Sequence, residues 1–156
     1  MRTLVLILSL FLSVFAWGKI IQLNCKSSQI KYAHQQLILN AAAVKQPQIY
    51  VFENRFNAPI LLNHEKYPPG ASAGWASKLN PQNASALMLM PDKHKFMMTC
   101  SVYDSNRTLD CAKVLKVCVV KNIPSEKIKT VGDFWVVENM PMNRVLDTIN
   151  KKFNAL

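Results

Sequence analysis

Four cysteines are the residues whose chemistry the sequence constrains most. They stand at Cys25, Cys100, Cys111 and Cys118 in a chain of 156 residues. An even number of cysteines in an exported chain is typical of disulfides, and four cysteines allow three connectivities. A structural zinc site would need ligands paired at short spacing, as in Cys-x-x-Cys, and the sequence contains no such pair. We therefore predict two disulfides rather than a metal centre.

A methionine-rich stretch offers a second kind of chemistry. It contains His94 and Met97, and thioether groups with histidine are suitable ligands for Cu(I) in an exported copper carrier. The alternative is that methionine fills the core, because Met88 or Met90 and Met98 fall on the apolar faces of predicted strands. We expect only His94 and Met97 to face solvent, so these two residues form the candidate copper site.

Other catalytic or cofactor signatures are not evident. The serines lie in no Gly-x-Ser-x-Gly elbow, and the four cysteines are assigned to disulfides. The three histidines have no triad partners that spacing reveals, and the nine acidic residues form no paired-carboxylate motif. We therefore predict a protein that is not an enzyme and that binds no cofactor.

A loop with small residues forms the candidate binding loop, represented by His64, Gly74 and Trp75. A Gly-Trp pair in such a loop can form a binding edge. The alternative, which the sequence favours, is a buried Trp75 that holds a long loop against the fold, with Gly74 where the backbone comes close.

The first 18 residues have the three parts of a signal peptide. Arg2 is the positive start, residues 4–15 form an apolar run, and Ala16 and Gly18 are small residues before the cut. The run is too short for a membrane anchor, which needs roughly 20 apolar residues. Cleavage would leave residues 19–156 as a single disulfide-stapled globular domain, periplasmic or secreted, with no membrane-spanning segment.

The chain is basic, with 19 Lys and Arg residues against 9 Asp and Glu and a formal net charge of +10. Loss of the signal peptide removes Arg2 and lowers this charge by one. Such a charge attracts anionic lipids, acidic glycans or nucleic acid. The lysines are scattered singly, which favours solubility as their role. Export and the lack of a basic cluster beside Trp75 or Trp135 argue against nucleic acid.

Short strands separated by turn signals dominate the chain up to residue 137. Alternating or β-branched residues predict strands at 49–52, 60–62, 84–90, 96–103, 114–120 and 134–137. Residues 37–44 are helix-tolerant, and the strands at 49–52 and 60–62 are expected to form a hairpin.

An amphipathic helix ends the chain. Its apolar stripe contains Met142, Val145, Leu146, Ile149, Phe153 and Leu156. We expect Asn139 to cap this helix and Pro141 to lie in its first turn. The predicted fold is mainly β: a small antiparallel β-sandwich or barrel-like sheet, stapled by disulfides, with one C-terminal amphipathic helix.

Strand alternation also constrains the disulfide pairing. Cys100 lies on the apolar face of its strand, whereas Cys118 lies opposite the apolar face of its own. Directly paired strands carry partners on the same face, so a Cys100–Cys118 bond is disfavoured unless a bulge shifts the parity. We expect Cys100–Cys111, which closes a short loop, and Cys25–Cys118, which ties the N-terminal arm to the sheet.

A series of short motifs over residues 45–120 carries a family resemblance. The motifs are Leu62-Asn63-His64, Ser72-Ala73-Gly74-Trp75, Ser85-Ala86-Leu87, Phe96 to Cys100, and Cys111 to Cys118. In this order they resemble the "enhanced entry" type of small exported proteins of intracellular bacterial pathogens, component B in particular. The resemblance implies a bacterial periplasmic or secreted protein associated with host-cell entry or intracellular survival, and it implies no catalytic residue.

Two functional hypotheses follow. The first is an exported, non-enzymatic binding or interaction protein, virulence-associated, whose partner is a protein or an envelope component. The second is a periplasmic copper-binding protein that uses His94 and Met97. An enzyme ranks third.

Overall fold

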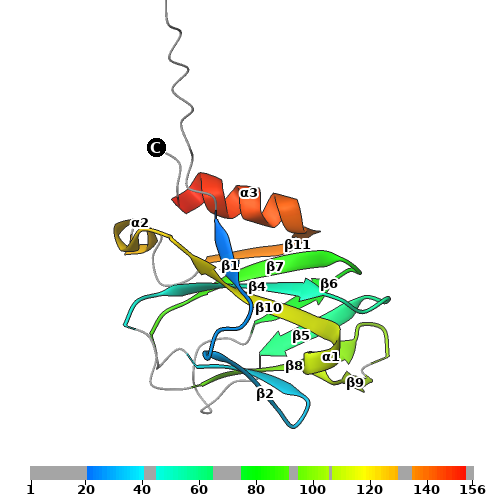
Figure 1. The fold of residues 1–156 in the computed structure, drawn as a ribbon. Coiled ribbons are helices and arrows are strands. Elements are labelled where there is room, and N and C mark those ends of the chain that lie inside the picture. Colours follow the sequence, from blue (N-terminus) through cyan, green and yellow to red (C-terminus); the bar gives the residue numbers. More distant parts are fainter. Residues whose placement is uncertain are drawn as a thin grey trace, which may run out of the picture.

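Two antiparallel β-sheets pack face to face, and a helix lies on the outer side of one of them (Figure 1). The structure is a computed structural model that describes residues 21–40, 45–64, 75–91, 95–105, 107–129 and 135–153. This architecture confirms the predicted sandwich with a C-terminal helix. The predicted signal peptide lies outside the described residues, so its cleavage stays a prediction. Among the helices that are described, none is long and apolar enough to cross a membrane.

The first sheet, sheet A, has the strand order β1-β10-β4-β7-β11 within the described residues. Its strands are β1 (Gln22–Asn24), β10 (Leu115–Lys121), β4 (Gln48–Asn54), β7 (Asn83–Leu89) and β11 (Trp135–Pro141). The three central strands are nearly continuous runs of buried residues. Such runs are typical of strands that are covered on both faces.

The second sheet, sheet B, has the strand order β2-β3-β8-β5-β6, with β9 paired to β8. Its strands are β2 (Ile30–Ala33), β3 (Gln36–Leu39), β8 (Phe96–Val102), β5 (Ile60–His64), β6 (Ala76–Leu79) and β9 (Thr108–Leu109). In β3 and β6, buried residues alternate with half-buried or exposed ones. This period of two is typical of a sheet with one face in the core and the other toward solvent.

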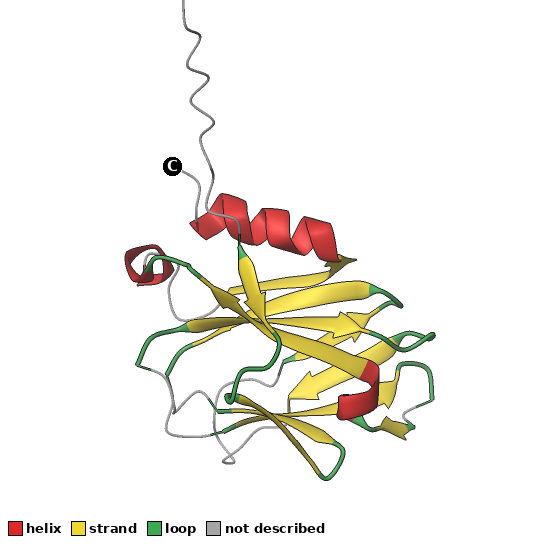
Figure 2. Cartoon of the chain, viewed as in Figure 1, coloured by secondary structure: helices red, strands yellow, loops and turns green. Residues whose placement is uncertain are grey.

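Three helices occur in the described residues: α1 (Cys111–Val114), α2 (Ser125–Lys129) and α3 (Met142–Phe153). The side chain of Asp110 caps α1 by accepting a hydrogen bond from the Ala112 N–H. Figure 2 shows α3 lying along sheet A, on the side away from sheet B. The predicted apolar stripe faces this sheet, because Val145, Ile149 and Phe153 are buried.

Two apolar clusters hold these layers together. The cluster between the sheets includes the fully buried Tyr50, Phe52, Leu62, Leu87 and Met98. The second cluster joins the outer face of sheet A to α3 and α2, and it includes Val51, Ala86, Ile128, Val145, Ile149 and Phe153. Sheet A is therefore buried on both faces, whereas sheet B is buried on its inner face.

Both disulfides have the predicted partners. Cys25, just after β1, is bonded to Cys118 of β10, at a sequence separation of 93. Cys100 of β8 is bonded to Cys111 at the start of α1, at a sequence separation of 11. The first bridge therefore fixes the N-terminal arm to sheet A. The second joins β8 of sheet B to α1, the helix that leads into β10 of sheet A.

The predicted hairpin of residues 49–52 and 60–62 is wrong. The first segment lies in β4, which pairs with β10 and β7 of sheet A, and the second lies in β5, which pairs with β6 and β8 of sheet B. Asn54 accounts for the change of sheet, because its Nδ2 donates to the carbonyls of Ala58 and Leu79. These two bonds, of which the one to Leu79 is buried, fix a turn that carries the chain across the sandwich.

Residues 37–44 were expected to tolerate a helix, but the first three of them belong to strand β3. Leu37 and Leu39 enter the core between the sheets. The chain reaches β3 through a two-residue turn at His34 and Gln35, which both have positive φ, at 50° and 68°. This backbone geometry favours a tight hairpin with β2, although asparagine and glycine are its usual residues. Residues 41–44 lie outside the described part.

The start of the C-terminal helix was predicted too early. Asn139 and Pro141 belong to β11, and α3 begins at Met142. Asn139 has a positive φ of 51° and lies at the irregularity where β11 changes register against β7. Its side chain accepts a hydrogen bond from the Asn80 N–H rather than from the helix. The last residue of the predicted stripe, Leu156, lies outside the described part.

Candidate functional site

The outer face of sheet B is a regular surface that no described helix covers. Because Leu37, Leu62 and Met98 point into the core, the alternate residues of their strands point outward. We call this surface the open face. It includes Lys31, Ala33, Gln36, Ile38, Leu61, Asn63, Ala76, Lys78, Met97, Thr99, Ser101 and Thr108, each of them half-buried or exposed.

Register places the apolar residues of the open face between its lysines. Ile38 lies beside both Lys31 and Met97, in a row across β2, β3 and β8. Leu61 lies beside Ser101 and Lys78, in a row across β8, β5 and β6. The open face therefore has two separate apolar rows, each with a lysine at its lateral edge, and the polar residues Thr99 and Asn63 lie between these rows.

The charge of the open face has one sign. The six strands of sheet B contain no Asp or Glu. Lys78 does not form a described ion pair and instead holds its ammonium 3.9 Å from the centre of the Tyr103 ring. A cation above an aromatic ring stays available to an anionic partner at its solvent side. The open face is therefore suited to a surface that offers both apolar contacts and acidic groups.

The structure brings together two residues of the candidate binding loop. The His64 N–H donates to the Trp75 carbonyl at 2.7 Å, so these residues form the two ends of the 65–74 segment. The imidazole of His64 stacks on Phe96 at 3.5 Å between ring centres, and its Nδ1 donates to the Met97 carbonyl at 2.9 Å. His64 is therefore held by both ring and backbone. Gly74 lies outside the described residues.

Trp75 is attached to sheet A rather than exposed as a free edge. Its ring packs against Phe52, with 6.0 Å between ring centres. Its Nε1 donates to the Glu138 carboxylate at 2.9 Å. Trp75 is half-buried, and these two contacts link the start of β6 to strands β4 and β11.

The candidate copper site is only partly described. Met97 points outward on the open face and is half-buried, and His94 lies outside the described residues. Met88 and Met98 are fully buried, whereas Met90 is 38% exposed. Among the described side chains, no group of three or more His, Cys, Asp or Glu is placed to hold a metal ion. Copper binding through His94 and Met97 stays a prediction.

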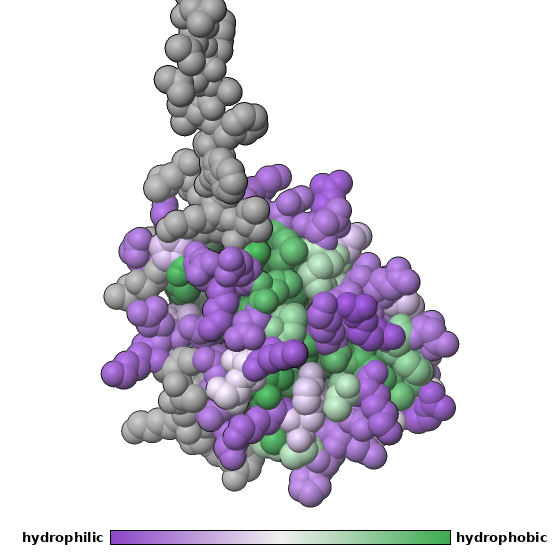
Figure 3. Space-filling view, viewed as in Figure 1, coloured by the Kyte–Doolittle hydropathy of each residue, from purple (hydrophilic) through white to green (hydrophobic). Residues whose placement is uncertain are grey.

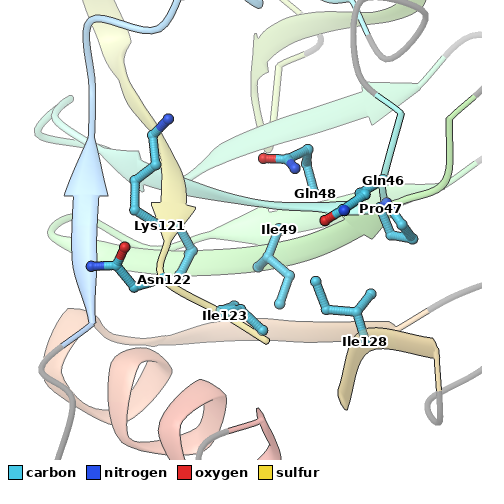
Figure 4. Close-up of a pocket in the computed structure, with 9 residues that line it drawn as sticks. Gln46, Pro47, Gln48, Ile49, Lys121, Asn122, Ile123 and Ile128 are labelled. Atoms are coloured by element: carbon cyan, nitrogen blue, oxygen red, sulfur yellow. The ribbon is translucent and has the colours of Figure 1, made fainter. Parts of the chain in front are cut away.

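A pocket of about 150 Å³ lies where β4 begins and β10 ends (Figure 4). The turn at Asn54 is at the other end of these two strands. Gln46, Gln48, Lys121 and Asn122 contribute its polar groups. Ile49, Ile123 and Ile128 form its apolar floor. Sequence reasoning missed this pocket, because it joins segments more than 70 residues apart and neither segment contains a motif.

A buried tyrosine marks a structural role rather than a reactive one. Tyr50 lies on the inner face of sheet A and is fully buried. Its hydroxyl donates to Oε1 of Gln29 at 3.1 Å. Burial raises the pKa of Tyr50 to about 12, because the phenolate would lose its hydration in the core. The hydroxyl therefore stays protonated at neutral pH.

Comparisons with known proteins add no relative, since no protein-family model, no curated protein and no solved structure matches the chain. The resemblance to the enhanced entry proteins is therefore left as a sequence-based prediction.

Proposed function

We propose that the chain is an exported, non-enzymatic binding protein that holds a protein partner of the cell envelope on the open face of sheet B. The observation that carries this proposal is the difference between the two sheets. Sheet A is covered on its outer face by α3, whereas the outer face of sheet B has no described cover.

The composition of the open face supports a protein partner. Protein interfaces have an apolar centre surrounded by a polar rim, and methionine is enriched in them. On the open face, Ile38, Leu61 and Met97 lie on the inner strands, and Lys31 and Lys78 lie on the edge strands β2 and β6. A partner with Asp or Glu around an apolar patch would complement this arrangement and would be steered toward it by charge.

Two further arguments concern the compartment and the source. Disulfides persist in oxidising compartments such as the periplasm or the extracellular space, and the chain contains two of them. This is consistent with the signal peptide that the sequence predicts. The resemblance to the enhanced entry proteins extends the proposal to a bacterial protein associated with host-cell invasion or intracellular survival.

Paired charge reversals test the open face. The exported, disulfide-bonded protein is immobilised as wild type, as Lys31→Glu with Lys78→Glu, and as a control with Lys151→Glu and Lys152→Glu on the exposed side of α3. Both variants change the net charge equally. Envelope extract is passed over all three, and quantitative mass spectrometry measures what each retains.

The supporting result is a protein that the wild type and the α3 control retain and the open-face variant loses. With that partner purified, we expect the open-face variant to bind roughly 10-fold more slowly, because charge acts mainly on the association rate. If both variants lose the same proteins, the attraction comes from net charge and the proposal is wrong. If neither variant loses any protein that the wild type retains, the open face is not the binding surface.

A further inference from the structure

The pocket between β4, β10 and α2 has features that the open face lacks. It lies on sheet A, so it is separate from the proposed partner surface. Figure 4 shows Gln46 and Gln48 on one side, Lys121 and Asn122 on the other, and Ile49 and Ile123 between them, with Ile128 below Pro47. The Lys121 side chain stands beside the pocket with its ammonium pointing away from the isoleucines. The pocket therefore combines hydrogen-bonding groups and an ammonium at its rim with an aliphatic floor.

Local backbone geometry creates this pocket. Strand β10 ends at Lys121, and Asn122 follows with a positive φ of 64°. Asparagine tolerates this left-handed conformation better than most residues. The change of direction places Ile123 in the floor and leads through Pro124 into α2, where Ile128 is buried in the cluster of sheet A and α3. The floor of the pocket is thus part of a packed core and is not easily rearranged.

The polar side chains at the rim have no partner among the residues that the structure describes. Within the described part of the chain, the side chains of Gln46, Gln48, Lys121 and Asn122 make no hydrogen bond or ion pair. Gln48 is half-buried, so its amide is only partly hydrated. Amide groups both donate and accept hydrogen bonds, and an ammonium only donates. This donor-rich rim suits a ligand that carries an anionic oxygen and a neutral amide or hydroxyl.

The charge around the pocket favours an anion. The described side chains of the segments that form it, residues 45–49 and 120–128, include Lys45, Lys121 and Lys127 against the single acid Glu126. Lys121 is exposed, so its flexible stem can place the ammonium over the pocket mouth. The aliphatic floor would contact the apolar body of the same ligand.

The volume limits the ligand to a small one. About 150 Å³ is less than the roughly 300–1,000 Å³ of pockets for drug-sized ligands. We propose that this pocket binds a small carboxylate with a short aliphatic body, of the size of one amino-acid residue. A free aliphatic acid and the C-terminal residue of a peptide share this chemistry.

N-acetyl-L-leucine and its amide, N-acetyl-L-leucinamide, test the carboxylate directly, because they differ only in that group. Each is titrated into the isotopically labelled protein while the backbone amide resonances are followed by NMR. We expect the acid to shift residues 46–49 and 120–123 with a dissociation constant of about 1–10 mM, as its small size implies. The amide should bind at least 3-fold more weakly. Isovalerate, titrated in parallel, separates a free aliphatic acid from a peptide end.

Two lysine variants on the same strand provide the control. Lys121→Gln should weaken binding of the acid about 3–5-fold, the modest loss expected for an exposed ion pair, and leave binding of the amide unchanged. Lys116→Gln removes an exposed lysine of β10 that lies near Glu53 instead, and it should change neither. Gln48→Ala should weaken both ligands.

Three results would overturn this inference. They are the absence of localised shifts at about 10 mM acid, equal affinity for the acid and the amide, and equal losses from Lys121→Gln and Lys116→Gln. These results would leave the proposal for the open face unaffected, because that proposal is tested by charge reversals at Lys31 and Lys78, on the other sheet. The two proposals therefore fail or stand separately.

Discussion

Sheets A and B use the same strand geometry but differ in what lies on their outer faces. The strands of sheet A present apolar side chains on both faces, and the chain supplies α3 to cover the outer one. The strands of sheet B alternate, so their outer face needs no cover. Ile38, Leu61 and Met97 lie on this outer face and are not part of the buried core. This difference separates the part of the molecule that determines stability from the part that is available for binding.

Figure 3 is consistent with this division on the face that it shows. Hydrophobic residues gather in the middle of the view beneath α3, and hydrophilic residues surround them and cover the outer side of the helix. On α3 the polar residues Asn143, Arg144, Asp147, Lys151 and Lys152 are exposed. Its buried side is fully used by sheet A, so the helix offers no unpaired apolar stripe.

The largest expected effects come from the two disulfides. Replacing Cys25 and Cys118 by alanine should lower the free energy of unfolding by about 4–5 kcal/mol, because this bridge closes the longer loop. Replacing Cys100 and Cys111 should cost about 3 kcal/mol. Guanidinium denaturation of both double variants measures the two values. A larger loss from the shorter loop would show that strain or packing, rather than loop closure, determines the contribution of each bridge.

A matched pair of isoleucines compares the two outer faces directly. Ile149 is fully buried between α3 and sheet A, whereas Ile38 is half-buried on the open face. Ile149→Ala should cost about 2–5 kcal/mol, and Ile38→Ala about 1 kcal/mol or less. Urea denaturation with a common slope for all variants provides the comparison. Equal losses would mean that the open face is covered in the native protein and that its role as a binding surface is wrong.

Much of this division could be predicted from local pattern. Alternation over 96–103 and the apolar stripe from Met142 to Phe153 each indicated one element with its buried side, and both are confirmed. Parity also disfavoured a Cys100–Cys118 bond, and the observed pairing agrees. These features depend on residues that are close in sequence, where side-chain periodicity decides the outcome.

The pairing of strands could not be predicted in the same way. Residues 49–52 and 60–62 were correctly identified as strands, but the hydrogen bonds of Asn54 direct them into different sheets. A polar residue at the end of a strand does not show which distant carbonyl it will meet. The open face requires the register of five strands, and the pocket requires Gln46 to meet Lys121, so both were beyond local pattern.

The smallest expected effect concerns a hydrogen bond that joins the two sheets. Tyr50 of sheet A donates to Gln29, the residue before β2 of sheet B. Tyr50→Phe removes this bond and should cost about 1 kcal/mol at neutral pH. The value is small because the ring of phenylalanine fills the same space, and the Gln29 amide is close enough to the surface to bind water instead.

The same substitution has an opposite effect at high pH. Burial raises the pKa of Tyr50 from 10.0 to about 12, so folding holds a proton that the unfolded chain releases. The contribution of the neutral hydroxyl is fully present below pH 10 and is lost as the pH rises toward 12. Wild type should therefore lose stability more steeply than Tyr50→Phe over this range, in urea denaturation at a series of pH values. The two proteins differ only at this residue, so the difference between the two curves isolates Tyr50. Parallel curves would mean that the phenolate is hydrated in the folded state, and that water reaches the interface between the sheets beside Gln29.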